Sequence, residues 1–111
     1  FNAGAILEAE DELNIAEGEA DAMILTQLGL PAIAFPGAKS WRPHHKRMLA
    51  GFPHVYIWAD PDEAGREFAD RVRNDLPHAR IVPLHDGDVG ETFLAGGVDA
   101  INEALDRLEG R

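Results

Sequence analysis

The sequence contains no cysteine among its 111 residues. This absence excludes disulfide bonds, a thiol nucleophile and cysteine-ligated zinc, so carboxylates and imidazoles remain as metal ligands and a hard cation is favoured. The sequence also has no apolar run of membrane length and no basic segment followed by an apolar leader. We therefore expect no membrane insertion or secretion, and a cytoplasmic protein.

Basic residues are also few, with ten Lys and Arg against twenty Asp and Glu and a formal net charge of -10. Proteins that hold nucleic acid by bulk electrostatics normally carry a surplus of basic residues, so any nucleic-acid contact must be local. For most of the acidic residues, a solvated surface that keeps a small domain soluble is a sufficient explanation.

The chain is 45% hydrophobic and 27% charged, which is typical of a single compact domain with a modest core. We expect one domain over residues 1–111. Phe1 is an unusual native start, so we expect this domain to be cut from a longer protein.

Short apolar strands alternate with amphipathic helices along the sequence. Strands are predicted at Leu13–Ala16, Ala32–Phe35, His54–Ala59 and Arg80–Leu84, and helices at Glu19–Leu28, Glu63–Leu76 and Val98–Leu108. The polar, basic stretch Lys39–Leu49 is expected to contain a further helix. The segment His85–Glu91 is predicted to be an acidic, glycine-containing loop. Such alternation predicts an α/β fold, with a largely parallel sheet covered by helices on both faces.

Acidic residues directly follow three of the predicted strands. Glu17 follows the first, Asp60 and Asp62 follow the third, and Asp86 and Asp88 follow the fourth. The ends of parallel strands meet at one edge of the sheet, where ligands of open α/β sheets bind. Two carboxylates about 4 Å apart repel by roughly 4 kcal/mol at an effective dielectric near 20, so a cluster needs a compensating cation.

Asp21 lies four residues after Glu17, in the first turn of the predicted helix, and is expected to face the same crevice. Oxygen ligands without cysteine favour Mg²⁺ or Mn²⁺, and phosphoryl transfer is the natural chemistry of such a site. Taken singly, each acid has a simpler explanation. Asp62 can be a helix cap, Asp60 a turn residue, and Asp21 a charge that complements a helix N-terminus. Their coincidence at successive strand ends favours the metal site.

Two motifs resemble those of the TOPRIM domain family, namely Glu17-Gly18-Glu19-Ala20-Asp21-Ala22 and Asp60-Pro61-Asp62-Glu63-Ala64-Gly65. With the following Gly-Leu-Pro-Ala and Gly-Arg, they look most like primases and primase-helicases of phages and plasmids. The resemblance extends over Leu13 to Gly97. It implies a Rossmann-like TOPRIM fold with a four-stranded sheet, and Glu17, Asp60 and Asp62 as metal-binding acids. Asp21 would be the helix acid of the first motif. Asp86 and Asp88 occupy the place of a further acidic loop, ahead of Glu91.

The resemblance implies a metal-dependent DNA primase that synthesises RNA primers, with Mg²⁺ or Mn²⁺ at the acids and Glu17 as a general acid or base. Its partners would be a single-stranded DNA template, an RNA primer, nucleotides and a helicase in the parent protein or complex. Two alternatives remain, a TOPRIM nuclease and a noncatalytic metal-binding module. A phosphoacceptor receiver domain is less favoured, because no lysine follows the fourth strand.

The segment from residue 39 to 47 holds Lys39, Arg42, Lys46 and Arg47, four of the ten basic residues. It is a candidate for local contact with nucleic-acid phosphates. The alternative is a solvated helix face with Trp41 packed as an anchor. Tyr56 and Trp58 lie within a predicted strand and are expected in the core, which makes Tyr56 a poor topoisomerase nucleophile.

Overall fold

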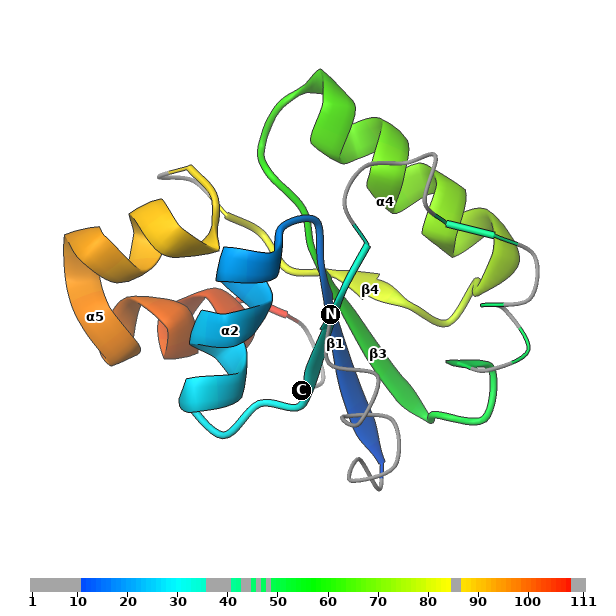
Figure 1. Cartoon of the computed structure of the whole chain (residues 1–111), viewed down its shortest axis with the longest axis horizontal. Helices are drawn as coiled ribbons and strands as arrows, with labels where there is room; N and C mark the ends of the chain where they lie inside the picture. Colours follow the sequence, from blue (N-terminus) through cyan, green and yellow to red (C-terminus); the bar gives the residue numbers. More distant parts are fainter. Residues whose placement is uncertain are drawn as a thin grey trace.

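The computed structural model describes residues 11–35, 41–42, 45, 47, 49–84 and 87–108. Its strands are β1 (Glu12–Ala16), β2 (Ala32–Ala34), β3 (His54–Trp58) and β4 (Arg80–Ile81). The helices that pack on the sheet include α2 (Glu19–Gln27), α4 (Glu63–Asp75) and α5 (Val89–Asp106). The strands form one parallel sheet in the order β2-β1-β3-β4. Helices α2 and α5 lie on one side of this sheet and α4 on the other (Figure 1). The predicted α/β fold is confirmed.

The strand order places a topological switch point at the centre of the sheet. From β1 the chain turns to β2 on one side, and it later returns to β3 on the other side of β1. Crevices at such points, beyond the carboxyl ends of the strands, are the usual ligand sites of open α/β sheets. The segments that leave β1 and β3 are therefore the first place to look for function.

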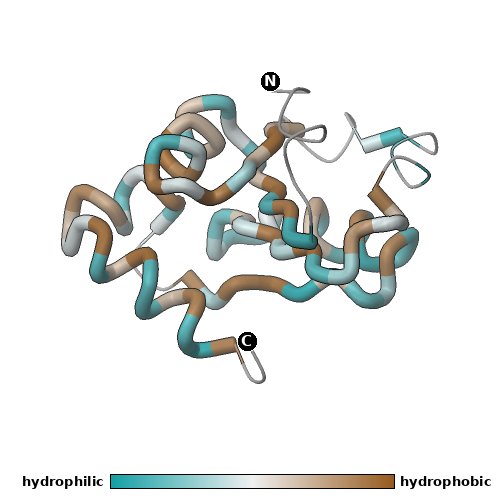
Figure 2. Tube along the Cα trace, turned by 90° about the horizontal axis from the view of Figure 1, so that it is seen from below, coloured by the Kyte–Doolittle hydropathy of each residue, from teal (hydrophilic) through white to brown (hydrophobic). Residues whose placement is uncertain are grey.

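Alternating strand residues supply two separate cores. Leu13, Ile15, Val55 and Ile57 pack toward α4, and Ala16, Tyr56 and Trp58 pack toward α2 and α5. The helices alternate between hydrophobic and hydrophilic residues along their turns (Figure 2). The clearest case is α4, whose buried residues Phe68 and Val72 belong to the core and have the helical spacing from which this helix was predicted.

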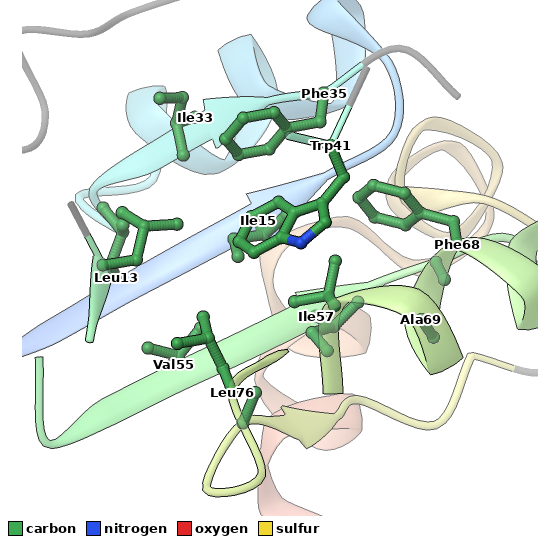
Figure 3. Packing of buried hydrophobic residues seen from close by; sticks show 14 of the residues in the cluster. Leu13, Ile15, Ile33, Phe35, Trp41, Val55, Ile57, Phe68, Ala69 and Leu76 are labelled. Carbon is green, nitrogen blue, oxygen red and sulfur yellow. The ribbon is translucent and has the colours of Figure 1, made fainter. Parts of the chain in front are cut away.

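Trp41 packs as an anchor in the α4-side core, beside Phe35 and Phe68 (Figure 3). Its side chain is buried, its ring meets Phe35 edge-on with centroids 5.2 Å apart, and its Nε1 donates a hydrogen bond to Asp75 Oδ2 at 2.7 Å. A tryptophan held in this way is not available for stacking on a base. Tyr56 and Trp58 are also buried, as predicted.

Asn14 is a fully buried polar residue at the middle of β1. Its Oδ1 accepts a hydrogen bond from Trp58 Nε1 at 2.8 Å, and its Nδ2 donates to the carbonyl of Pro31 at 3.1 Å. The side chain thereby joins β1 to β3 and to the residue that precedes β2. Because an unpaired polar group in this position would be costly, these bonds favour one register of the strands.

The prediction of a loop through Glu91 was wrong, because α5 begins at Val89, whereas the helix predicted from Val98 is present as the part of α5 that follows Gly97. Asp88 Oδ1 accepts from the Glu91 N–H at 2.8 Å, and Glu91 Oε1 accepts from the Asp88 N–H at 3.2 Å. This capping box starts a first helical part of α5, before Gly97, that was predicted to be a loop up to Glu91. Gly97 has a φ of 66° and a ψ of -154°, which are not helical, so α5 consists of two helical parts that meet at a kink there.

The predicted fourth strand was also too long, since β4 ends at Ile81 rather than Leu84. The ladder reaches one residue further through a bond from Val82 N–H to the Ile57 carbonyl at 2.9 Å. Pro83 comes next and has no N–H to donate, which explains why regular pairing stops.

The helix predicted within the stretch Lys39–Leu49 is present near the end of this stretch. Trp41 and Arg42 are not helical, whereas His45, Arg47 and Leu49 are. The Arg42 N–H donates to His45 Nδ1 at 2.9 Å, so the chain turns here instead of continuing a helix. Arg42 and Arg47 are exposed, while Lys39 and Lys46 lie outside the described residues. In the part of the chain that the structure describes, no helix is both long and apolar enough to cross a bilayer.

Candidate metal centre

The site lies at the switch point, where the segments after β1 and β3 meet. Glu17 directly follows β1, and its Oε2 accepts a hydrogen bond from the Asp60 N–H at 2.7 Å. Ala16 pairs with Trp58 in the sheet, so the parallel register brings these two strand exits side by side. Glu17 therefore fixes the backbone of the segment that carries Asp60 and Asp62.

Asp21 enters the site from the first turn of α2. Its side chain is buried, and its Oδ1 accepts from the Gly90 N–H of α5 at 3.1 Å. Burial, followed by the charge of Asp88, raises the pKa of this carboxyl, although the Gly90 N–H acts in the opposite direction. The predicted convergence of Asp21 with the strand-end acids is what the structure shows.

Asp60 experiences the strongest combination of burial and negative charge. Its pKa is raised to about 6, first by burial and then by the charges of Glu17, Asp88, Asp21 and Asp62. Its Oδ1 is buried and has no hydrogen-bond partner among the described residues. Without a bound cation, an unpartnered carboxylate oxygen close to four other acids is energetically unfavourable, because it lacks a hydrogen bond and is repelled by their charges.

Carboxylate oxygens of Asp21, Asp60 and Asp88 all lie within 4.8 Å of one another. We call these three residues the donor triad. Ligands on opposite sides of Mg²⁺ are about 4.2 Å apart, since each bond is about 2.1 Å. The three oxygens are therefore close to the separation of ligands that share one ion. The triad fits a hard divalent cation, and the unpartnered Asp60 Oδ1 is the atom that most needs one.

Asp62 plays a second part at this edge. It is exposed and is the N-cap of α4, where its Oδ1 accepts from the Gly65 N–H at 2.6 Å. Its charge still contributes to the raised pKa of Asp60. The structure therefore brings Glu17, Asp21, Asp60, Asp62 and Asp88 to one edge, whereas Asp86 lies outside the described residues. Metal ligation by these acids stays a prediction.

Comparison with known proteins agrees with this geometry. Residues 14–89 match the family model described as Toprim-like. The chain belongs to the Toprim-like family. The match includes both acidic motifs and ends at the first residue of α5, so all three members of the donor triad lie within the TOPRIM region.

The chain covers very different shares of two similar proteins. The chain is 39% identical over 106 residues to the gene 57 protein of Mycobacterium phage D29, covering 95% of this chain and 70% of that protein. It is 35% identical over 103 residues to the DNA primase of Pseudomonas aeruginosa, covering 90% of this chain but only 14% of the primase. The chain thus corresponds to a small part of that enzyme.

Two solved structures share the TOPRIM fold. The primase fragment of the bacteriophage T7 primase-helicase protein aligns with a TM-score of 0.74 and 24% identity, covering 86% of this chain and 44% of that one. A DNA primase domain from Pseudomonas aeruginosa aligns with a TM-score of 0.70 and 26% identity, covering 93% and 36%. The chain is a TOPRIM domain similar to those of primases.

Two glycines support the TOPRIM site and were not recognised from the sequence. A Cβ at Gly65 would lie 1.9 Å from the carbonyl oxygen of Asp60, so only glycine permits α4 to begin this close to the segment that carries Asp60. Gly90 supplies the N–H that binds Asp21. The spacing Asp88-x-x-Glu91 is a capping-box pattern that, if used, would have placed α5 and its first N–H groups at the site.

The raised pKa of Asp60 predicts an unusual pH dependence of metal-free stability. A carboxyl whose pKa is higher in the folded state, here about 6, favours folding in its protonated form. Its contribution is fully present below the unfolded value of 3.8 and is lost as the pH rises through about 6. We expect the melting temperature of Asp60→Asn, relative to wild type, to increase between pH 5 and pH 7. Calorimetry in EDTA measures this difference, and a constant difference would contradict the repulsion described above.

Proposed function

We propose that this domain is the catalytic TOPRIM domain of a DNA primase, which transfers nucleotides in a reaction dependent on Mg²⁺ or Mn²⁺ to make RNA primers. The observation that carries the proposal is the donor triad at the switch point, with the buried and unpartnered Asp60 Oδ1 among its atoms. The similarity to primase domains at 26% identity supports the choice of reaction.

Each acid has a distinct part in this mechanism. Asp21, Asp60 and Asp88 would hold the ion, and Asp62 adds negative charge from the start of α4. When bound, a divalent cation neutralises phosphate oxygens and stabilises the charge that develops during transfer. Glu17 is held by the Asp60 N–H at the rim of the triad, where it accepts the proton of the attacking hydroxyl. Glu17, Asp60 and Asp62 are the proposed catalytic residues.

The proposed partners are nucleotides, a single-stranded DNA template and the RNA primer. Arg42 and Arg47 are exposed, which suits contact with phosphates, and Lys39 and Lys46 belong to the same proposed surface. The T7 protein is a primase-helicase, which supports a helicase in the parent protein or complex of this domain. DNA replication in the cytoplasm is the proposed setting.

The decisive experiment uses the full-length protein that contains this domain. With a single-stranded template, Mg²⁺ and labelled ribonucleotides, we expect new RNA, and Glu17→Gln should lower its rate by about 10²–10⁴-fold, the usual contribution of a general base. Glu103→Gln, an exposed substitution on α5, is the matched control. Shortening of labelled DNA with Mn²⁺ instead would identify a nuclease. Inactivity in both assays with metal binding intact would identify a noncatalytic module.

A further inference from the structure

A pocket of about 210 Å³ opens between the first half of α4 and the chain around β4. Its walls are mainly nonpolar and include Pro61, Ala69, Ile81 and Pro83. Ile81 is a large hydrophobic residue with 37% of its surface exposed, at the edge of the sheet. The pocket is smaller than the roughly 300–1,000 Å³ of sites for drug-sized ligands, so it suits one flat ring system.

The pocket adjoins the metal centre. Asp60 lines it and is also a member of the donor triad. Pro61, the next residue, forms part of the wall. A ligand in this pocket therefore lies next to one member of the donor triad.

A positively charged side chain, that of Arg66, lies at the border of the pocket. Arg66 lines it and is exposed, one helical turn after Asp62. Within the described ranges, its guanidinium forms no ion pair or hydrogen bond, although Glu63, Glu67 and Asp70 lie on the same helix. A guanidinium binds phosphate oxygens through two parallel hydrogen bonds, so Arg66 is suited to bind the phosphate of a ligand that also carries a metal ion.

We propose that this pocket binds the base of a nucleoside triphosphate, with Arg66 on its phosphates and the polyphosphate directed to the donor triad. This inference rests on the proposed function, and it assigns the incoming nucleotide to the α4 side of the site. The base would contact the nonpolar walls, and Arg66 would bind a phosphate. The carboxylates of the donor triad would bind the metal ion that accompanies the phosphates. Two other ligands fit less well. Inorganic polyphosphate has no group to fill the pocket, and an apolar peptide side chain would make no use of the charge of Arg66.

The test compares two ligands by isothermal titration calorimetry on the full-length protein with Mg²⁺, namely ATP and tripolyphosphate. We expect ATP to bind at least about tenfold more tightly, because only ATP carries a base for the pocket. Ile81→Trp fills the pocket from an edge position that tolerates aromatic residues, and it should remove this advantage without weakening tripolyphosphate. Arg66→Ala should weaken both ligands.

Matched controls are Val98→Trp, at a partly exposed position of α5, and Arg73→Ala, on the exposed surface of α4. Neither should change either affinity. Wild-type protein gives an independent measurement, since nuclear Overhauser effects between adenine H8 and the Ile81 methyl groups are expected and do not depend on a variant folding.

Three results would overturn the inference. If tripolyphosphate binds as tightly as ATP, and Asp60→Asn weakens both, the pocket is wrong while the proposed function stands. If neither ligand binds, both proposals fail. If Ile81→Trp converts a dimer to a monomer in sedimentation without changing ATP affinity, the pocket is an interface between copies of the chain.

Discussion

Asp60→Asn is expected to remove the stabilisation that Mg²⁺ gives the wild-type protein. A ligand at one hundred times its dissociation constant stabilises the folded state by about 2.7 kcal/mol, which corresponds to a rise on the order of 10 °C for a domain of this size. Without metal at neutral pH, the variant should melt above wild type, because it removes a carboxylate that is repelled by Glu17, Asp88 and Asp21. Differential scanning calorimetry with Mg²⁺ and with EDTA measures both effects.

Asp70→Asn is the control, since Asp70 is exposed on α4 and should leave the response to Mg²⁺ unchanged. Asp62→Asn separates two roles of one residue. Asparagine caps a helix about as well as aspartate, so the cap on Gly65 is retained and any lost response reports the charge of Asp62 at the metal. An unchanged response in the double variant Asp60→Asn, Asp62→Asn would refute the metal site.

Gly65→Ala is expected to destabilise the protein by about 3 kcal/mol or more, at or beyond the upper end for overpacking. The new Cβ would lie 1.9 Å from the Asp60 carbonyl oxygen, 2.8 Å from its carbonyl carbon and 2.9 Å from its nitrogen. These are all backbone atoms, so no side-chain rotation relieves the overlap. Either α4 or the Asp60 segment must move, and the donor triad should lose its geometry and its affinity for Mg²⁺. Urea unfolding gives the stability and calorimetric titration gives the affinity.

Steric overlap and helix propensity predict opposite effects of Gly65→Ala on stability. Alanine is a better helix former than glycine by about 1 kcal/mol, so helix propensity alone predicts that Gly65→Ala stabilises α4. The control Gly51→Ala introduces a Cβ with no atom within 4 Å and should change the free energy of unfolding little. A stable Gly65→Ala variant with normal metal affinity would show that the Asp60 segment is not held against α4 as described.

Much of the fold was predictable because its signals are local. The continuous buried run Val55–Trp58 marks a strand, the apolar stripe of Glu63–Asp75 has helical spacing, and alternation of strands and helices implies the parallel sheet. Parallel strands in turn place Glu17 and Asp60 at one edge without any knowledge of side-chain contacts. The structure shows both residues there, joined by a hydrogen bond.

The remaining features depend on contacts between distant segments. Gly90 and Asp21 are 69 residues apart, and nothing in either local sequence announces their hydrogen bond. The clash that requires Gly65 exists only once α4 is docked over Asp60. The early start of α5 is different, since its capping box is a local pattern that the acidic character of the segment obscured.

The bond between Asn14 and Trp58 has a consequence for the metal centre. A parallel strand that slips by two residues keeps its inward and outward faces but moves by about 6.6 Å, more than the 4.8 Å spanned by the donor triad. Such a slip would leave both hydrophobic cores plausible and separate Glu17 from Asp60. The buried hydrogen bond between Asn14 and Trp58 favours one of these alignments, so a contact within the core helps to set the spacing of the acids at the edge of the sheet.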